Sequence, residues 1–472
     1  MTLNVAWTAQ DVVNATHGHS LHEQTWIAHD VTIDSRSTKA GDLFVALKGP
    51  LHDGHDYVAK AFEAGCSAAI VSRQPSQVSQ ASPLLFVNDS FVALESLGQA
   101  GRQRAKGRIL AVTGSVGKTS SKEMLRIMLR AMGRTYANEG SLNNHWGVPL
   151  SLSRLPSEAE YGIFEIGMNH AGELGPLSRM VKPHIAMITS IEAVHLEFFP
   201  NLESIADAKA EIFQGIQPDG SVILNHDNAY YSRLAASAKD HGIKRILSFG
   251  QAGKNDARLL AFTPTAEGCS VQADIQGQIV NYQLGAFGQH QAINSLGTLL
   301  AAHTAGGDIH VCANALAHYH PPQGRGGIHV IKRLHDSFIV IDESYNASPA
   351  ALRAAIHVLA QTQPSLPTGR RLMVLGDMKE LGDSSAALHA NLAQDLVDHK
   401  IDIVYCCGPM MSHLFEALPP SHRGAYSLDS AHLVSSVVDN IKGGDVVTIK
   451  GSHSMNMNVI VNALKALSAP LY

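Results

Sequence analysis

The stretch RILAVTGSVGKTSSKEMLRIMLRAM, residues 108–132, decides the fold of this chain. RILAV has the apolar character of a buried strand, and KEMLRIMLRAM has the 3.6-residue periodicity of an amphipathic helix. Between them lies a loop of small residues, TGSVGKTS (113–120). A strand, a glycine loop and a helix in this order predict a phosphate-binding loop at a helix N-terminus.

The loop sequence also predicts which atoms would hold a nucleotide. Small residues let consecutive backbone N–H groups converge on phosphate oxygens, and the helix dipole adds positive potential. Lys118 would reach the β- and γ-phosphates, and the Thr119 hydroxyl would bind Mg²⁺. The generic pattern has glycine where Val112 stands, so the match is to the shorter form G-x-x-G-K-[ST]. The predicted nucleotide-binding residues of the loop are Gly114, Ser115, Val116, Gly117, Lys118, Thr119 and Ser120.

Three further apolar runs indicate neighbouring strands of one sheet, YGIFEIG (161–167), HIAMITS (184–190) and SVILN (221–225). Strands that alternate with helices favour a parallel, doubly wound sheet. Glu165 stands near the end of the first run, and His195 follows the second. Because ligands of such sheets bind outside the carboxyl ends of the strands, we expect these two side chains to bind Mg²⁺ beside the loop.

The regions on either side of this sheet have their own patterns. Before it, the apolar runs LFVAL (43–47) and AAIV (68–71) alternate with turns, as in a small α/β unit. After it, residues 255–287 predict an antiparallel excursion, and PPQGRGG (321–327) predicts a linker or hinge. The strand-like runs beyond the hinge are SFIVIDE (337–343), RLMVLGD (371–377), DIVYCCG (402–408) and DVVTIKG (445–451).

We therefore expect three α/β domains. A chain of 472 residues is too long for one core, since a domain usually takes about 100 to 200 residues. The expected domains are a small N-terminal one (1–84), a central one with a mostly parallel phosphate-loop ATPase sheet (85–320), and a Rossmann-like one (321–472).

Composition narrows the class of function. Hydrophobic residues make up 45% and charged residues 16%, which is typical of packed globular proteins. A net charge of −5 gives no overall attraction for nucleic acid. The five cysteines are scattered without a C-x-x-C pair, which favours a reducing cytoplasm. With no signal peptide and no run of about 18 apolar residues, we expect a soluble monomer without membrane insertion.

Motifs along the whole chain carry a family resemblance. The first domain contains DSRSTKAGDLFVALKG and DGHDY, and the central one TGSVGKTSSKEM, NNHWGVPLSL, EIGMNHAGEL, HLEFF, AKAEIF and GQHQAINSLGTLLAA. The third contains GRGG, IDESYNASPAAL, LGDMKELG and IKGS. In this order they resemble the Mur ligases of peptidoglycan synthesis. LGDMKELG (375–382) is similar to the branch that joins D-alanyl-D-alanine to UDP-N-acetylmuramoyl-tripeptide.

The resemblance implies a role for each domain, namely recognition of the UDP-sugar by the first, of ATP by the second, and closure with dipeptide docking by the third. Ser35 and Arg36 would lie at the uridine-diphosphate end of the substrate. Asn143 and Asn144 would lie near the substrate and the γ-phosphate, and Asn294 would contact adenine. The residues implied to reach the nucleotide from the hinge and the third domain are Arg325 and Asp342.

The comparison with the family also concerns one lysine and one place where this chain differs from the usual family sequence. Lys209 in AKAEIF aligns with the lysine that the family carbamylates to make a carboxylate-like ligand for a second Mg²⁺. The implied catalytic set is then Lys118, Glu165, His195 and Lys209, and the implied metal ligands are Thr119, Glu165, His195 and Lys209. After KGS the family usually has arginine and then glutamate, whereas this chain has His453 and Asn458 near those places.

The chemistry expected of such a site is amide-bond formation. A carboxylate is a poor acyl donor, so ATP would first phosphorylate the terminal carboxylate of the tripeptide, and the dipeptide amine would attack the acyl phosphate. Lys118 and Mg²⁺ would offset the negative charge in both steps. Three alternatives stay open at this point: a Mur ligase with another amino-acid donor, a phosphate-loop regulatory ATPase, and a UDP-sugar binding protein without catalysis.

Overall fold

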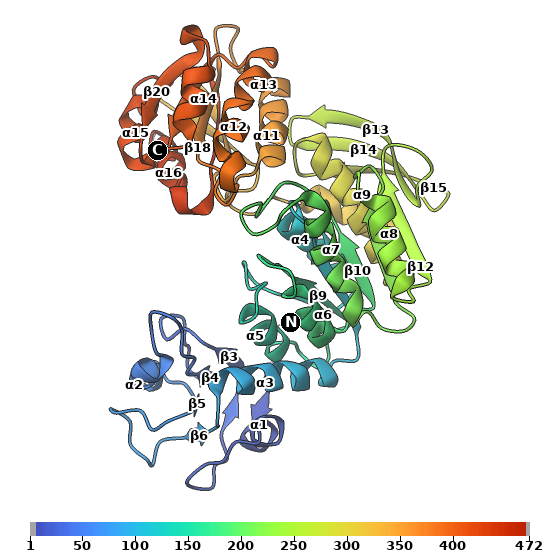
Figure 1. The fold of residues 1–472 in the computed structure, drawn as a ribbon, viewed down its shortest axis with the longest axis vertical. Helices are drawn as coiled ribbons and strands as arrows, with labels where there is room; N and C mark the ends of the chain where they lie inside the picture. Colours follow the sequence, from blue (N-terminus) through green and yellow to red (C-terminus); the bar gives the residue numbers. More distant parts are fainter. Residues whose placement is uncertain (1–5, 469–472) are drawn as a thin grey trace.

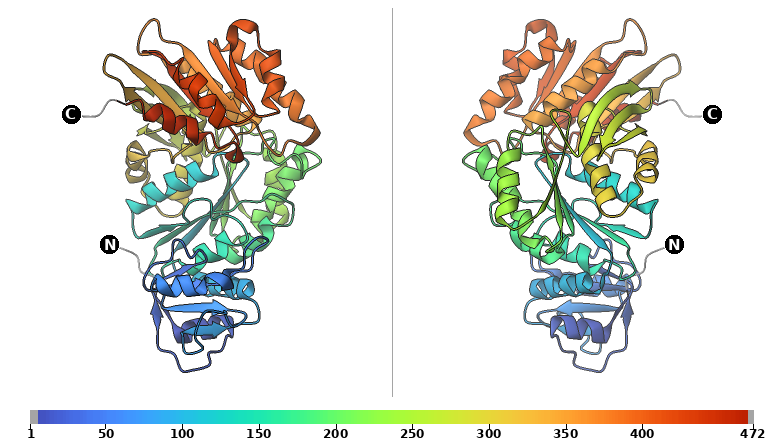
Figure 2. Two further views of the ribbon diagram at one scale, coloured as in Figure 1. Left: turned by 90° about the vertical axis from the view of Figure 1, so that its left-hand side faces the viewer. Right: turned by 90° about the vertical axis from the view of Figure 1, so that its right-hand side faces the viewer.

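The computed structural model describes residues 6–468 and contains three main sheets that follow one another along the chain. Figure 1 shows three lobes around an open hollow, and both side views in Figure 2 place the N-terminal and C-terminal lobes at opposite ends of the central one. No helix within residues 6–468 is long and apolar enough to cross a membrane.

The first lobe is built on a four-stranded parallel sheet in the order β3-β4-β5-β6. A small antiparallel pair, β1 with β2, lies beside it. The strands are β1 (Trp7–Thr8), β2 (Ile27–Ala28), β3 (Asp30–Thr32), β4 (Asp42–Val45), β5 (Ala68–Val71) and β6 (Leu84–Phe86). The helices are α1 (Ala9–Thr16), α2 (Val58–Glu63) and α3 (Ser90–Arg104).

The central sheet has nine strands in the order β15-β14-β13-β12-β11-β10-β7-β9-β8. The neighbouring strands β13, β12, β11, β10, β7, β9 and β8 are parallel to one another. The pairs β13 with β14 and β14 with β15 are antiparallel. Its strands are β7 (Arg108–Thr113), β8 (Thr135–Ala137), β9 (Tyr161–Glu165), β10 (Ile185–Ile188), β11 (Ser221–Asn225), β12 (Arg245–Gly250), β13 (Ala257–Thr265), β14 (Gly268–Ile275) and β15 (Gln278–Leu284).

Helices cover both faces of this sheet. One face packs with α4 (Lys118–Arg130), α9 (Gln289–Thr304) and α10 (Ile309–Ala315) into an apolar core that includes Leu110 and Met187. The other core lies under α5 (Gly147–Ser153), α6 (Leu174–Val181), α7 (Leu202–Ala210) and α8 (Tyr231–Asp240). Burial on both faces explains why the parallel strands are almost continuously apolar.

The third lobe has a six-stranded sheet in the order β16-β17-β21-β18-β19-β20, in which only β16 is antiparallel. Its strands are β16 (Gly327–Lys332), β17 (Ser337–Glu343), β18 (Arg371–Gly376), β19 (Ile403–Cys407), β20 (Arg423–Ser427) and β21 (Val446–Lys450). Its helices are α11 (Pro349–Gln361), α12 (Ser385–Ala390), α13 (Leu392–Asp398), α14 (Met411–Ala417), α15 (Ser430–Val438) and α16 (Asn458–Lys465).

The predicted α/β class, the parallel sheets and the antiparallel excursion are confirmed. The prediction of four strands beyond the hinge was too low, because β16 and β20 are also present. Both lie at the edges of the sheet, where exposed residues interrupt the apolar pattern that identifies inner strands. The boundaries at residues 84 and 320 stay predictions.

Helix α3 packs against the central lobe through two glycines, Gly98 and Gly101. A Cβ at Gly98 would lie 2.8 Å from the carbonyl oxygen of Pro149, and one at Gly101 would lie 2.2 Å from that of Leu152. Both carbonyl groups belong to α5, so α3 and α5 approach each other more closely than larger side chains at these two positions would allow. The orientation of the first lobe therefore depends on this contact.

Replacing Gly101 with alanine should destabilise the protein by about 1 to 3 kcal/mol, because the new methyl group overlaps backbone that cannot move independently. Urea unfolding measures the change. Gln103→Ala, at an exposed position of the same helix, is the matched control and should change stability by less than about 0.5 kcal/mol. An unchanged midpoint for Gly101→Ala would contradict the close packing of α3 on α5.

Candidate active site

The phosphate loop lies at the point where the order of the central sheet reverses. From β7 the chain continues to β8 and β9 on one side, and then crosses to β10 on the other. In the register of the sheet Val112 pairs with Glu165 of β9, and Thr113 pairs with Ile188 of β10. The carboxyl ends of these three strands therefore meet, and such a switch point is where open α/β sheets bind ligands.

The Glu165 carboxylate is buried at this edge, with a residue exposure of 1%, and both of its oxygens have partners. The Thr119 hydroxyl donates to Oε2 at 2.8 Å, and Asn143 Nδ2 donates to Oε1 at 2.7 Å. Asn138 accepts from the Glu165 backbone N–H at 2.8 Å. The hydrogen bonds compensate a charge that would be costly to bury alone, and they bring Thr119 and Glu165 together as predicted.

Two glycines give the loop its shape. Gly114 has a φ of +146° and Gly117 a φ of +85°, values that other residues rarely adopt. A Cβ at Gly114 would overlap the Thr189 hydroxyl, and one at Gly117 would lie 2.7 Å from Asn294 Nδ2. Asn294, predicted to contact adenine, therefore lies directly against the loop.

Lys118 begins α4 and bends back over the loop. Its Nζ donates to the carbonyl oxygens of Gly114 at 2.7 Å and Ser115 at 3.2 Å. Burial lowers the pKa of Lys118, while the nearby Glu165 carboxylate raises it. The ammonium group is therefore held above the loop, where the phosphates of a nucleotide would lie.

Lys209 in α7 is a second buried lysine of the site. Its residue exposure is 2%, and burial holds its pKa well below the ordinary lysine range, with the charge of Lys118 adding to the effect. Because a lowered pKa favours the neutral amine, Lys209 has the nucleophilic form that addition to carbon dioxide requires.

His195 lies in the loop after β10 and has a φ of +58°. Its Nδ1 is hydrogen-bonded to Glu380 Oε2 of the third lobe. Burial lowers its pKa, the Glu380 carboxylate opposes that shift, and Lys118 and Lys209 add to it. These four side chains thus influence one another electrostatically, although they come from four separate segments.

The remaining predicted substrate residues lie in two places. Asn144 Oδ1 accepts from the N–H groups of Trp146 at 3.2 Å and Gly147 at 2.9 Å, so this oxygen orders the start of α5. In the first lobe Ser35 is half-buried, and the Arg36 side chain is 81% exposed and paired with Asp34 at 2.7 Å. The substrate roles of these residues stay predictions.

The hinge residues form a cluster around Tyr345. The Arg325 guanidinium carbon lies 4.1 Å from the centre of the Tyr345 ring, and the His453 ring lies 5.2 Å away on centres. Asp342 is buried and accepts from Gly324 N–H at 3.2 Å and the Ser344 hydroxyl at 2.6 Å. Asp342 therefore fixes the 324–327 segment in this structure, and its predicted contact with nucleotide stays a prediction.

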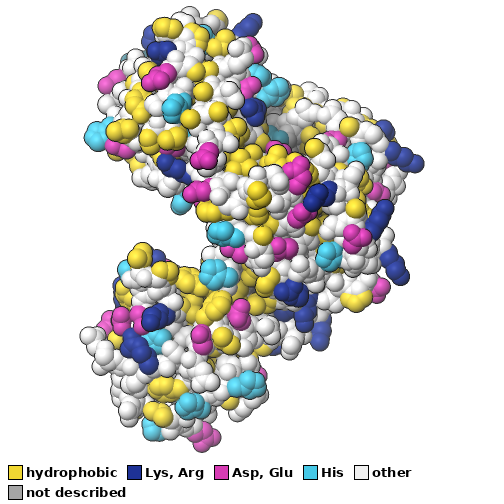
Figure 3. Space-filling view, in the orientation of Figure 1, with side chains coloured by type: hydrophobic (Ala, Val, Ile, Leu, Met, Phe, Trp, Pro, Cys, Tyr) yellow, Lys and Arg dark blue, Asp and Glu magenta, His cyan; other side chains and the backbone are white. Residues whose placement is uncertain are grey.

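The loop of residues 138–146 touches all three lobes. Asn143 binds Glu165 of the central sheet, and the Ser141 hydroxyl is hydrogen-bonded to the Tyr345 hydroxyl of the third lobe. Trp146 packs with the apolar core of the first lobe. Figure 3 shows the open hollow between the outer lobes, with the central lobe as its wall. The hollow is therefore bordered by all three lobes.

Sequence reasoning missed three residues of the site, Asn138, Tyr345 and Glu380. Asn138 is 1% exposed, and its side chain binds both backbone groups of Glu165, since it also donates to the Glu165 carbonyl oxygen at 3.3 Å. Tyr345 and Glu380 lie inside motifs that were noticed, IDESYNASPAAL and LGDMKELG. Their contacts join residues far apart in the chain, so only the fold reveals them.

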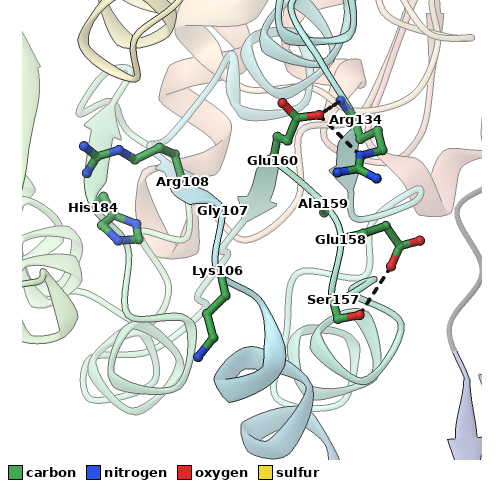
Figure 4. Close-up of a pocket in the computed structure, with 9 residues that line it drawn as sticks. All are labelled: Lys106, Gly107, Arg108, Arg134, Ser157, Glu158, Ala159, Glu160 and His184. Atoms are coloured by element: carbon green, nitrogen blue, oxygen red, sulfur yellow. Dashed lines mark hydrogen bonds and ion pairs between the residues drawn. The ribbon is translucent and has the colours of Figure 1, made fainter.

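A hollow of about 430 Å³ lies at the other end of the central strands, around the starts of β7 and β9. Figure 4 shows Arg134 turned to Glu160, with Nε and Oε1 3.3 Å apart, while Lys106 points away from them. The basic groups therefore do not converge on one point. This edge is the amino end of the parallel strands, where ligands of such sheets do not usually bind.

The donor set fits Mg²⁺ if the nucleotide supplies the other ligands. Thr119 and Glu165 place a hydroxyl and a carboxylate oxygen side by side at 2.8 Å. Within residues 6–468 no group of three or more His, Cys, Asp or Glu side chains could hold a metal by itself. Mg²⁺ typically takes one or two protein oxygens together with phosphates and waters, so both observations agree with a nucleotide-dependent site.

The fold and site define a three-lobed α/β protein with a phosphate loop at the switch point of its central sheet. Family models match as the Mur ligase family, catalytic domain (residues 28–93), the Mur ligase middle domain (112–302) and the Mur ligase, glutamate ligase domain (328–453). This chain belongs to the Mur ligase family.

Individual relatives narrow the similarity to one branch. The UDP-N-acetylmuramoyl-tripeptide–D-alanyl-D-alanine ligase of Rickettsia prowazekii is 35% identical, covering 92% of this chain and 94% of its own. MurF from Acinetobacter baumannii superposes with a TM-score of 0.86 at 31% identity, covering 98% and 100% of the two chains. MurF from Thermotoga maritima in complex with ADP gives 0.78 at 25% identity, covering 93% and 97%.

Lys209→Met should raise stability near neutral pH, because it removes a buried amine that must give up its proton when the chain folds. The folded pKa lies below the ordinary value of 10.5, so between the two values the unfolded chain binds a proton that the folded chain lacks. Wild-type stability should therefore increase with pH in this window, and the advantage of the variant should shrink.

Unfolding in carbon dioxide-free buffer at several pH values from neutral toward the ordinary lysine pKa measures this trend. The exposed Lys106→Met is the control and should show no such pH dependence. A Lys209→Met advantage that stayed constant or grew with pH would refute a depressed pKa for Lys209.

Proposed function

We propose that this chain is an ATP-dependent ligase that joins D-alanyl-D-alanine to UDP-N-acetylmuramoyl-tripeptide and releases ADP and phosphate. The observation that carries the proposal is the meeting of Lys118, Thr119 and Glu165 at the switch point of the sheet. This arrangement suits a bound nucleoside triphosphate. Relatives over nearly the whole chain are named for this reaction.

The chemistry begins with activation of a carboxylate. The terminal carboxylate of the tripeptide attacks the γ-phosphorus of ATP, which forms an acyl phosphate and releases ADP. Lys118 offsets the negative charge that develops on the transferred group. When bound, Mg²⁺ would neutralise phosphate charge. Thr119, Glu165 and His195 are the residues suited to hold it, and Lys209 as its carbamate is suited to hold a second ion.

The second step forms the amide bond. The free amine of D-alanyl-D-alanine attacks the acyl carbon, and the tetrahedral intermediate collapses with release of phosphate. No covalent protein nucleophile is required, so the contribution of the chain is positioning and charge. The contacts of loop 138–146 with all three lobes support a site in which the first lobe holds the UDP-sugar and the third holds the dipeptide.

Formation of ADP should require both UDP-tripeptide and D-alanyl-D-alanine. The assay measures ADP with the complete mixture and with each substrate left out, using tripeptides that end in lysine or in diaminopimelate. ADP formed at the full rate without either substrate would point to a regulatory ATPase. A preference for a single amino acid over the dipeptide would point to another Mur ligase.

Two lysine variants control this assay. Lys118→Ala should lower the rate by about 10²- to 10³-fold, since it removes a charge directed at the transferred phosphoryl group. Lys106→Ala, at an exposed position at the other edge of the central sheet, should keep the wild-type rate. Near-normal turnover by Lys118→Ala would remove the phosphate loop from the mechanism.

A further inference from the structure

The loop that follows β18, residues 377–382, reaches from the third lobe to the site histidine. Glu380 in this loop is hydrogen-bonded through Oε2 to His195 Nδ1. Its carbonyl oxygen also accepts from Glu197 N–H at 3.1 Å. Leu196, which lies between these two partners, packs against the apolar core of the third lobe. The contact therefore combines two hydrogen bonds with apolar packing.

The backbone on either side of Glu380 is held firmly by its own lobe. Met378 and Leu381 on either side of it are buried in the core, at 1% and 3% exposure. The backbone N–H groups of Met378 and Lys379 donate to His389 Nε2 and Ser452 Oγ, each at 2.9 Å. The backbone here thus cannot move without breaking buried contacts, whereas the Glu380 side chain is 42% exposed and is held by its hydrogen bond to His195.

Both members of the pair have an unusual backbone. His195 has a φ of +58° and Glu380 a φ of +63°, which lie in the left-handed region. This conformation is unfavourable for a residue other than glycine, because Cβ approaches the following carbonyl oxygen. Strain of this kind persists where surrounding structure enforces it, and it concentrates at functional sites. Here it occurs on both sides of a single contact between lobes.

The hydrogen bond determines which nitrogen of His195 is available. An ionised carboxylate only accepts hydrogen bonds, so the hydrogen lies on Nδ1, and Nε2 keeps its lone pair when the ring is neutral. A carboxylate on one ring nitrogen is the usual support for a histidine that binds metal through the other. The segment that leads to His195 is hydrogen-bonded to the phosphate loop, since Glu192 N–H donates to Ser115 Oγ at 2.9 Å and Ser115 N–H donates to the Ser190 carbonyl oxygen at 2.8 Å.

We infer that Glu380 is a positioning residue, through which docking of the third lobe orients His195 toward the metal and nucleotide. This inference rests on the proposed function and deepens it. Docking of the third lobe, as it occurs in this structure, supplies the carboxylate that fixes the ring, so the support of His195 depends on this contact between lobes. LGDMKELG would then contribute to the reaction through His195 without itself contacting the phosphates.

Binding of Mn²⁺ as a probe, followed by electron paramagnetic resonance in the presence of ADP, tests this inference on the full chain. Glu380→Ala should weaken Mn²⁺ binding by about 10- to 100-fold, as loss of such supporting carboxylates does. Glu380→Gln keeps an oxygen acceptor for Nδ1 and should recover part of the affinity. The affinity for ADP without metal should stay within twofold of wild type in both variants.

Asp383→Asn is the matched control, because it replaces an exposed carboxylate three positions further along the chain, and it should bind Mn²⁺ as wild type does. Unchanged Mn²⁺ affinity in Glu380→Ala would overturn the inference. An equal loss of ADP affinity with and without metal would also overturn it, since Glu380 would then only dock the lobe.

The second variant, Glu380→Gln, and the use of Mn²⁺ and ADP alone allow the role of Glu380 to be tested separately from folding and from the ligase reaction. If Glu380→Ala does not fold, Glu380→Gln carries the test, with a weaker but measurable loss expected and wild-type affinity counting against the inference. These measurements use neither UDP-tripeptide nor dipeptide. A wild-type chain that binds Mn²⁺ and ADP but forms no amide would refute the proposed function and leave the role of Glu380 standing.

Discussion

The buried carboxylate of Glu165 is the constraint on which the rest of the site depends. A charge in the core of a sheet must be met by hydrogen bonds, and here Thr119 and Asn143 donate to the carboxylate, while Asn138 accepts from the Glu165 backbone N–H and holds the end of β9. Because Thr119 lies in the first turn of α4 and Asn143 lies in the loop after β8, the carboxylate connects the phosphate loop to loop 138–146. The hydrogen bonds that make the burial tolerable thus also fix the positions of Thr119 and Asn143 relative to each other.

Contacts between the lobes extend this arrangement outward. Loop 138–146 joins Glu165 to the first lobe through Trp146 and to the third through Ser141. His195 joins the central sheet to the third lobe through Glu380. A reaction that brings together a nucleotide, a UDP-sugar peptide and a dipeptide needs such shared walls, since proximity and orientation are the main contributions of the protein.

The sequence predicted the parts of the fold with strong local patterns. The inner strands are apolar runs, and the phosphate loop combines small residues, a lysine and a following helix, so Lys118, Thr119 and Glu165 could be assigned to one edge before the fold was known. The edge strands β16 and β20 were missed because their exposed residues break that pattern. Asn138, Tyr345 and Glu380 were missed because their partners lie in distant segments, and polar contacts of this kind leave no local period in the sequence.

The central claim is that the tripeptide carboxylate is activated as an acyl phosphate, and transfer of an oxygen isotope tests it most directly. UDP-tripeptide labelled with ¹⁸O in its terminal carboxylate is incubated with ATP, Mg²⁺ and D-alanyl-D-alanine, and the products are analysed by mass spectrometry. The account predicts that one ¹⁸O atom appears in the released phosphate for each amide bond formed, while ADP stays unlabelled. Amide formation with unlabelled phosphate would contradict it.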